Sequence, residues 1–144
     1  MNIRLALPSE TKGLFELDHL QSRSAHWSEP DWQAELAQAA ARVWGAFCDE
    51  KLVGFICVRG AAGQYEITNL AVEPGHTRQG IGRALLDCAL AQLKTSGAAQ
   101  ITLEVSVLNE PARALYERGG LTALGVRKKF YPDGSDALIM GKKL

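Results

Sequence analysis

The sequence predicts a single α/β domain over residues 1–144, with helices around a mixed sheet (α+β) in the order β-α-α-β-β-β-α-β-α-β-β. Apolar and polar residues alternate in several short segments, which is typical of half-buried strands. Two compact turns join three of these segments in the middle of the chain. A glycine-containing segment then leads from a strand into an apolar helix and a further strand. This unit, residues 64–107, predicts a right-handed parallel crossover, with helices on both faces of the sheet.

The first third of the chain predicts one strand and two helices. Residues 2–7 alternate in polarity and are expected to form the strand. A helix begins at Pro8, with Ser9 as its candidate N-cap, and apolar residues follow at helical spacing. Ser28 begins a second, alanine-rich helix that is expected to continue to about residue 41.

Three strands are predicted in the centre of the chain. Residues 42–48 and 52–58 are separated by a hairpin turn that includes Asp49. A second turn at residues 60–63 leads into a strand over residues 65–72. Neighbouring strands joined by such short turns pair antiparallel, so these three segments predict a meander.

The segment after this meander predicts a long helix that begins after Gly80. It is apolar on most sides, and only Arg83, Asp87 and Lys94 form a polar stripe at helical spacing. A helix of this kind is largely buried against a sheet. It is expected to end before Gly97.

The last third predicts a strand, a short helix and two final strands. Residues 100–107 alternate strictly in polarity. The polar face of this strand carries Thr102, Glu104 and Ser106. Asn109 is a candidate N-cap for a helix that runs to Arg118. Residues 121–131 and 136–142 are the predicted final strands.

The composition excludes several classes of protein. With 47% hydrophobic residues, the chain can bury a core without disulfides or metals. Its 16 basic and 16 acidic residues balance, so the general basic footprint of a nucleic-acid-binding protein is absent. Residues 1–50 carry eight acidic and four basic side chains, which predicts attraction of a basic peptide. The acidic residues named for this role are Glu10, Glu16, Asp18, Glu29, Asp31 and Glu35.

The sequence also favours a reducing compartment. Cys48, Cys57 and Cys88 are an odd set without metal-ligand spacing, and each lies in an apolar run, so buried reduced thiols are expected. The histidines are scattered, and no metal site is predicted. No secretory leader and no run of about 18 apolar residues is found, so we expect a cytoplasmic protein without membrane association.

The segment around Gly80 and Gly82 predicts a phosphate site. Glycine lets a ligand approach the backbone closely, and the first turn of a helix offers unpaired N–H groups at the positive end of the helix dipole. Arg78 and Arg83 flank this turn. Together these features favour a phosphate or pyrophosphate group at the start of the helix.

Two other interpretations of this segment were weighed. A dinucleotide fingerprint has two of its three glycines here, but its third position is Leu85. Glu104 lies at about the distance expected of a ribose ligand, yet it falls in the middle of its strand. The roughly 60 residues that remain are too few for a doubly wound sheet with a separate substrate region. A plain helix start that binds no ligand is the other alternative.

A resemblance to the GNAT superfamily of acetyl-CoA-dependent N-acetyltransferases begins in this segment, which reads Thr77-Arg78-Gln79-Gly80-Ile81-Gly82. The pyrophosphate loop of that superfamily is usually Gln/Arg-x-x-Gly-x-Gly/Ala. The predicted order of strands and helices also matches theirs. The resemblance therefore implies the GNAT fold and acetyl-CoA as the donor.

Three later motifs narrow the resemblance to the RimI branch. One strand reads Leu103-Glu104-Val105-Ser106-Val107-Leu108-Asn109, which is similar to Leu-Glu-Val-Arg-x-Ser-Asn. The next helix reads Ala114-Leu115-Tyr116-Glu117-Arg118-Gly119-Gly120-Leu121, which is similar to Ala-x-x-Leu-Tyr-x-x-x-Gly-Phe. The tail contains Arg127-Lys128-Lys129-Phe130-Tyr131-Pro132 and Asp136-Ala137-Leu138-Ile139-Met140, which resemble Arg-x-x-Tyr-Tyr-x and Glu-Asp-Ala-x-x-Met. RimI enzymes acetylate the N-terminal alanine of a small-subunit ribosomal protein, S18.

The chain departs from the RimI pattern at several positions. Thr77 replaces a longer polar residue at the start of the phosphate loop. Ser106 and Ser135 stand where arginine and glutamate are usual, and Leu121 replaces phenylalanine. The two serines bear on peptide selectivity more than on chemistry.

The resemblance also implies roles for individual residues. Glu104 would be the general base and Tyr116 the acid for the departing thiolate. A backbone N–H at the end of the strand over residues 65–72 could polarise the thioester carbonyl. The residues expected to bind the cofactor are Leu70, Ala71, Val72, Arg78, Gln79, Gly80, Ile81, Gly82, Arg83 and Asn109. The basic run Arg127-Lys128-Lys129 is interpreted mainly as a solvated face.

The function that follows is acetyl transfer from acetyl-CoA to the N-terminal α-amino group of a basic protein N-terminus, S18 by resemblance. A small-molecule or lysine N-acetyltransferase is the alternative within the superfamily. A non-catalytic acyl-CoA-binding protein is an alternative of a different class, although the presence of both Glu104 and Tyr116 speaks against it.

Overall fold

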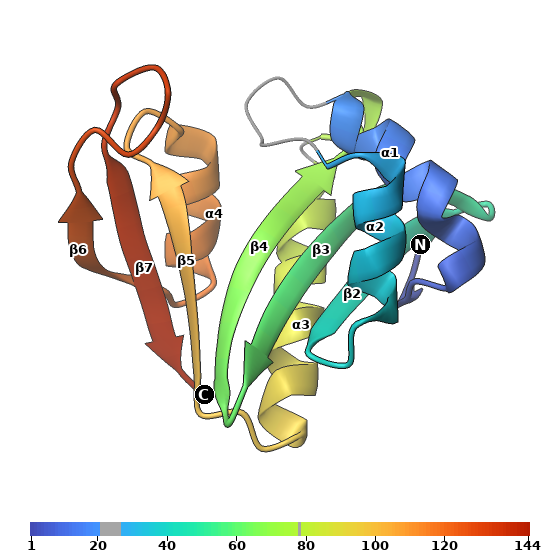
Figure 1. Cartoon of the computed structure of the whole chain (residues 1–144), viewed down its shortest axis with the longest axis horizontal. Helices are drawn as coiled ribbons and strands as arrows, with labels where there is room; N and C mark the ends of the chain where they lie inside the picture. Colours follow the sequence, from blue (N-terminus) through green and yellow to red (C-terminus); the bar gives the residue numbers. More distant parts are fainter. Residues whose placement is uncertain (21–26, 78) are drawn as a thin grey trace.

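A seven-stranded sheet runs through the computed structural model, which describes residues 1–20, 27–77 and 79–144 (Figure 1). The strand order is β1-β2-β3-β4-β5-β7-β6. Only β4 and β5 pair parallel, and the other neighbouring strands pair antiparallel. The strands are β1 (Asn2–Leu5), β2 (Ala41–Cys48), β3 (Lys51–Ala61), β4 (Gln64–Val72), β5 (Gln100–Ser106), β6 (Thr122–Arg127) and β7 (Ala137–Lys143).

Helices cover both faces of this sheet. Helices α1 and α2 lie on one face, and α3 and α4 lie on the other (Figure 1). The helices are α1 (Thr11–His19), α2 (Glu29–Ala37), α3 (Ile81–Thr95) and α4 (Glu110–Arg118), and two 3₁₀ turns are η1 (Pro8–Glu10) and η2 (Pro74–His76). The predicted order of strands and helices is therefore confirmed.

The core has two parts because strand residues alternate between the two faces. Val43 and Phe55 pack on the side of α1 and α2, whereas Trp44 and Ile56 pack on the side of α3. Helix α3 is buried along one face, as its apolar pattern predicts. Its buried residues are Ile81, Leu85, Leu86, Ala89, Leu90 and Leu93.

The ends of one helix and one strand differ most from the predicted boundaries. Helix α2 ends at Ala37 instead of continuing to residue 41, because Ala40 and Ala41 already take part in hydrogen bonds and pairing with the end of β3. Sheet pairing thus overrides the helix propensity of alanine. Strand β6 ends at Arg127 instead of residue 131, because the chain turns through a positive φ of 51° at Lys129.

The three cysteines are free thiols. Cys57 is fully buried, and burial together with the nearby charges of Glu35 and Asp18 raises the pKa of its thiol well above the usual range. Cys48 and Cys88 are only half-buried, so the expectation of buried thiols is correct in full for Cys57 alone. Within the described ranges, no helix is long and apolar enough to cross a membrane.

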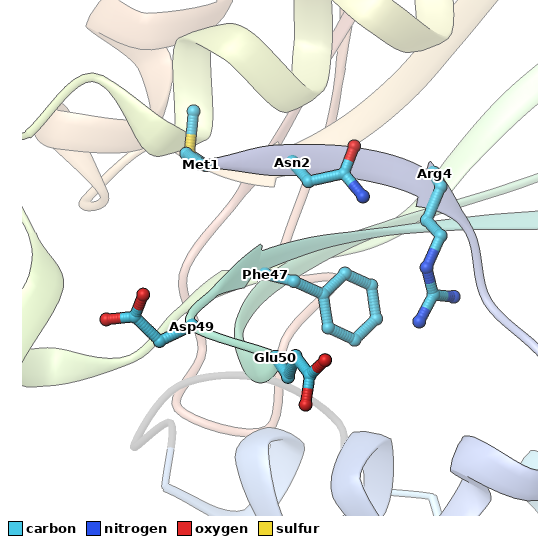
Figure 2. A pocket seen from close by; sticks show the side chains of 6 residues that line it. All are labelled: Met1, Asn2, Arg4, Phe47, Asp49 and Glu50. Carbon is cyan, nitrogen blue, oxygen red and sulfur yellow. The ribbon is translucent and has the colours of Figure 1, made fainter.

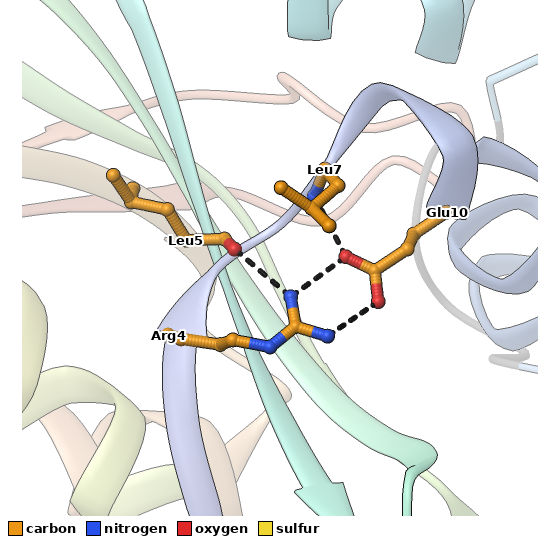
Figure 3. Close-up of polar contacts among 4 residues, drawn as sticks. All are labelled: Arg4, Leu5, Leu7 and Glu10. Carbon is orange, nitrogen blue, oxygen red and sulfur yellow. Dashed lines mark hydrogen bonds and ion pairs between the residues drawn. The ribbon is translucent and has the colours of Figure 1, made fainter.

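An ion pair fastens the edge strand β1 to the turn that precedes α1 (Figure 3). Both guanidinium NH₂ groups of Arg4 donate to the carboxylate of Glu10, each at 2.8 Å. The same carboxylate accepts the backbone N–H of Leu7 at 2.7 Å. Ser9, the expected N-cap, lies inside η1, and the Glu10 carboxylate satisfies the first amide instead.

This ion pair predicts a pH-dependent stability. The hydrogen bonds from Arg4 lower the pKa of Glu10, so the contribution to stability is complete above about pH 4.5 and is lost as the pH falls through the lowered pKa. We expect Glu10→Gln to lower the urea midpoint at pH 7, and the difference from wild type to shrink at acid pH. Glu16→Gln, which neutralises an exposed carboxylate on α1, is the matched control. Equal effects of the two variants at pH 7 would contradict the prediction.

Candidate functional site

The two parallel strands separate toward their carboxyl ends. Pairing between β4 and β5 covers only Gln64–Glu66 and Gln100–Thr102. Beyond these residues β4 continues beside β3 and β5 beside β7, and the two strands diverge (Figure 1). A bulge between β3 and β4 after Cys57 adds to the bend of β4. A fork of this kind, at the carboxyl ends of parallel strands, is where ligands bind in open α/β sheets.

Both later helices begin at the open end of this fork. Helix α3 starts nine residues beyond the end of β4, and α4 starts four residues beyond the end of β5. The predicted phosphate turn is therefore placed at the mouth of the fork. The first amides of α3 point out of the helix without an intrahelical acceptor, which is the arrangement that binds anions.

Glycine stands at the two positions of this turn for different structural reasons. Gly80 is the N-cap of α3 and has a φ of +78°, a left-handed conformation that other residues adopt only with strain. A Cβ on Gly82 would lie 3.4 Å from Leu115 of α4 and 3.8 Å from Val72 of β4. Position 82 thus faces the space between the end of β4 and α4, and a side chain there would narrow it.

The other residues predicted around the turn are placed less uniformly. Gln79 is exposed, whereas the side chain of Ile81 is buried in the core, so Ile81 offers a ligand only its backbone N–H. The Arg83 side chain bonds both carboxylate oxygens of Asp87, at 2.9 and 3.1 Å, one turn along its own helix. It would have to leave Asp87 to reach a phosphate. Arg78 lies outside the described residues.

The end of β4 presents its backbone to the fork. Leu70 and Val72 are half-buried against the α3 side of the sheet, and Ala71 is buried on the opposite side. All three residues pair with β3 and lie beyond the last β4–β5 pair. The structure therefore places them where a ligand between β4 and β5 could meet main-chain groups.

Glu104 lies on the polar face of β5, opposite Ile139 of β7. Its side chain is 24% exposed, and its Oε1 lies 3.1 Å from Nε of Arg127. The interpretation of Arg127 as a solvated basic residue was incomplete, because the end of β6 brings it onto Glu104. No local sequence signal connects these residues, since they lie 23 positions apart.

Tyr131 lies within electrostatic range of both Glu104 and Tyr116. Tyr116, on α4, is 8% exposed, and burial, with a smaller effect of Tyr131, raises the pKa of its phenol to about 12. Tyr131, in the β6–β7 loop, is half-buried, and its pKa is raised by burial and by the negative charges of Glu104 and Asp133. Sequence reasoning assigned Glu104 and Tyr116 to the site but gave Tyr131 no role.

Asn109 begins α4, as predicted. Its side-chain oxygen accepts the amide of Ala112 at 3.3 Å, which leaves the side-chain NH₂ as the group that could donate to a ligand. Pro111 lies in the first turn, where its missing N–H costs nothing.

A buried carboxylate on the other face supports the end of β4. Asp18 is fully buried and accepts the amide of Trp27 at 3.0 Å and the indole N–H of Trp32 at 3.3 Å. Its other oxygen accepts a hydrogen bond from the side-chain NH₂ of Asn69, the residue before Leu70, at 3.3 Å. The sequence analysis counted Asp18 as a surface charge, and this was wrong.

The same finding weakens the prediction that the N-terminal half attracts a basic peptide. Asp18 and Glu35 are buried, and Glu35 forms an ion pair with Arg59. Glu10 is paired with Arg4, and Asp31 exchanges hydrogen bonds with its N-cap Ser28. Of the acidic residues that were named, Glu16 and Glu29 are the exposed ones without such a role in the described contacts. The surface is less acidic than the count of charges indicates.

A surface hollow of about 510 Å³ lies away from this fork, at the outer edge of the sheet. Figure 2 shows its lining side chains, which come from β1 and from the end of β2 with its turn: Met1, Asn2, Arg4, Phe47, Asp49 and Glu50. None of the predicted site residues lines it. Nor do the described residues contain three grouped His, Cys, Asp or Glu side chains that could hold a metal ion.

Comparison with known proteins defines the class. The model of the acetyltransferase (GNAT) family matches residues 11–121. The ribosomal protein bS18-alanine N-acetyltransferase of Escherichia coli (strain K12) is 34% identical over 137 residues, which cover 91% of each chain. An N-alpha-acetyltransferase of Sulfurisphaera tokodaii is 30% identical over 143 residues, covering 98% of this chain and 83% of the relative.

A solved structure agrees with these relatives. The crystal structure of the ribosomal-protein-S18-alanine N-acetyltransferase from Escherichia coli superposes with a TM-score of 0.91 and 28% identity, over 99% of this chain and 92% of the other. The chain belongs to the GNAT acetyltransferase family, whose members use acyl-CoA. Within that family it is homologous to RimI, the ribosomal protein bS18-alanine N-acetyltransferase.

Proposed function

We propose that this GNAT domain, residues 1–144, transfers the acetyl group of acetyl-CoA to the N-terminal α-amino group of a protein, the alanine of ribosomal protein S18, in the cytoplasm. The observation that carries the proposal is the fork between β4 and β5, with Glu104 on β5 beyond the last β4–β5 pair and with α3 and α4 beginning beyond the ends of these strands. Homology to the E. coli enzyme that acts on bS18 supports the substrate.

In the proposed reaction each site residue has a separate task. The first amides of α3 bind the pyrophosphate, and backbone groups at Leu70–Val72 hold the pantetheine arm and polarise the thioester carbonyl. Glu104 takes a proton from the substrate amine, directly or through water, as the nitrogen attacks that carbonyl. Tyr116 gives its proton to the sulfur as the carbon–sulfur bond breaks, and the products are the acetylated amine and CoA.

The choice of an N-terminal amine follows from the weakness of a carboxylate base. An α-amino group has a pKa near 8, so making it neutral at pH 7 costs about 1.4 kcal/mol. A lysine, with a pKa near 10.4, costs about 4.6 kcal/mol. A glutamate base therefore suits an N-terminus better than a lysine side chain.

A lysine or small-molecule substrate is the second candidate. Ser106 and Ser135, which replace the arginine and glutamate of the RimI pattern, are the observation that favours it. Both positions lie at the end of β5 and in the neighbouring loop, close to the proposed amine site.

One experiment separates these functions. The protein is incubated with acetyl-CoA and a lysine-free peptide that begins Ala-Arg, and the product is followed by mass. A matched peptide has a blocked N-terminus and a free lysine. We expect acetylation of the first peptide alone. Acetylation of the lysine peptide alone would favour the second candidate, and acetyl-CoA binding without any transfer would favour a binding protein.

The two glycines of the phosphate turn predict different consequences of substitution. Gly82→Ala is expected to fold normally, because its Cβ would meet Leu115 at ordinary contact distance, but to raise the KM for acetyl-CoA about tenfold by narrowing the fork. Gly80→Ala is expected to lose about 1–2 kcal/mol of stability through its left-handed backbone. Steady-state kinetics and urea unfolding check both, with Gly75→Ala, whose Cβ meets nothing within 4 Å, as the control. An unchanged KM in Gly82→Ala would contradict the proposed path of the cofactor.

A further inference from the structure

A chain of hydrogen bonds joins the end of β5 to the loop between β6 and β7. The hydroxyls of Ser106 and Ser135 lie 3.3 Å apart. Ser135 Oγ lies 2.6 Å from Oδ1 of Asp133, and the amide of Leu108 lies 3.2 Å from Ser106 Oγ. The two serines are therefore the middle of a four-membered chain.

The chemistry of its ends fixes the direction of this chain. A backbone amide can only donate, and a carboxylate can only accept. Ser106 accordingly accepts from Leu108 and donates to Ser135, and Ser135 donates to Asp133. Each hydroxyl acts once as donor and once as acceptor. Hydrogen bonds linked in this way strengthen one another, so losing either hydroxyl interrupts the whole chain.

The β6–β7 loop, at one end of this chain of hydrogen bonds, is held together by its own hydrogen bonds. The amide of Tyr131 donates to the carbonyl of Ser135 at 3.2 Å, and the amide of Gly134 donates to the carbonyl of Tyr131 at 2.9 Å. The amide of Ser135 also donates to Asp133, at 2.8 Å. Because the loop is tied internally, holding Ser135 also holds Tyr131.

The hydrogen-bond chain connects two parts of the proposed site. Ser106 lies two residues beyond Glu104 on the same face of β5. The negative charge of Glu104 also contributes to the raised pKa of Tyr131. At the other end, Leu108 immediately precedes Asn109, which begins the helix that carries Tyr116. The serine pair therefore connects the loop beside the base with the turn that starts α4.

The two serines are also the two positions where the chain departs from the arginine and glutamate of the RimI pattern. In this protein the two positions contact each other through uncharged hydroxyls.

We propose that Ser106 and Ser135 act as a pair of positioning residues that hold the 131–135 loop against the amine substrate beside Glu104. The proposal rests on the proposed acetyl transfer and adds the determinant of amine binding. The pair touches neither the phosphate turn nor the end of β4 in the described contacts, and the cap bond between Asn109 and Ala112 does not involve it. Its effect is therefore expected on binding of the amine.

The test measures Ser106→Ala, Ser135→Ala and the double variant with acetyl-CoA and the Ala-Arg peptide. Each single variant is expected to raise the KM for the peptide about fivefold, the value of one hydrogen bond, with kcat and the KM for acetyl-CoA within about twofold of wild type. Because the hydroxyls form one chain, the double variant should equal a single variant instead of multiplying the two effects.

Two controls separate positioning from a general loss of structure. Ser96→Ala removes a hydroxyl that also makes several hydrogen bonds, at the end of α3, and should leave the peptide KM unchanged. Ser106→Thr keeps the hydroxyl and should restore most of the peptide affinity. Multiplicative effects, a change confined to acetyl-CoA, or an unchanged peptide KM would each overturn the proposal.

A measurement that does not depend on catalysis distinguishes failure of the serine-pair proposal from failure of the proposed acetyl transfer. Hydrogen exchange of the backbone amides in residues 131–135 should be faster in Ser106→Ala than in wild type, although residue 106 lies on a different element. Unchanged exchange rates would overturn the proposed role of the serine pair. If the wild-type protein acetylates a lysine or a small amine instead of the peptide, the proposed function fails. The same variants measured with that amine then decide the role of the serine pair.

Discussion

Replacing Glu104 by glutamine is expected to lower kcat by about 10²–10⁴-fold, the usual range for the loss of a general base. Glutamine has nearly the same shape but cannot accept the amine proton. The fold should survive, because the side chain is 24% exposed and its partner Arg127 is more than half exposed, so the lost ion pair is worth little stability. Steady-state kinetics with the Ala-Arg peptide, together with calorimetric titration of acetyl-CoA, measures the effect.

The matched control for this variant is Glu66→Gln. Glu66 is an exposed carboxylate on β4, at the end of the strand that still pairs with β5. It should leave kcat and acetyl-CoA binding unchanged. If Glu104→Gln kept the wild-type kcat, another group or the solvent would have to remove the proton, and the assignment of Glu104 as base would be wrong.

Tyr116→Phe is expected to lower kcat by about 10²-fold, the lower end of the range for a general acid, because a thiolate is already a good leaving group. The ring is buried in the core and stays in place in the phenylalanine variant, so unfolding should shift little. The comparison variant is Tyr65→Phe, which removes a phenol from a half-buried tyrosine on β4, away from the fork. Equal kcat values in wild type and Tyr116→Phe would remove Tyr116 from the mechanism.

The pH dependence of the wild-type enzyme provides an independent check of the same residue. A proton donor is active below its pKa, and burial raises the pKa of Tyr116 to about 12. Its deprotonation should therefore cause no fall in kcat between pH 7 and about pH 10.5, whereas an ordinary tyrosine would already be losing its proton near pH 10. A limb near pH 10 that disappears in Tyr116→Phe would show that the hydroxyl is more exposed to water than the structure indicates.

The local parts of this protein could be predicted because their causes are local. The alternation over residues 100–107 fixes which side of β5 is buried, and Glu104 falls on the polar side. Asn109 caps α4 through an amide three residues away, and Ser28 begins α2 in the same manner. Gly80 precedes α3 with the left-handed backbone that glycine permits. Interactions between residues three or four positions apart can be inferred directly from the order of residues in the sequence.

The ends of elements were less predictable because sheet pairing decides them. Alanine favours helix at the end of α2, yet Ala41 pairs with Arg59 of β3 and so belongs to a strand. The segment after Arg127 has strand-like residues, but the positive φ of Lys129 turns it into a loop. That loop brings Tyr131 to the site.

The sequence by itself determined the order of elements. With its resemblance to the GNAT superfamily, it also indicated the turn proposed to bind phosphate and the two residues proposed for proton transfer. Only the tertiary structure decided their surroundings: Arg127 on Glu104, the burial of Asp18 under the end of β4, and the contact between Ser106 and Ser135. These partners lie 23 to 51 positions apart in the chain. Their contacts exist only after the sheet has closed the intervening loops, and burial is a property of the whole packed core, so no short stretch of sequence contains them.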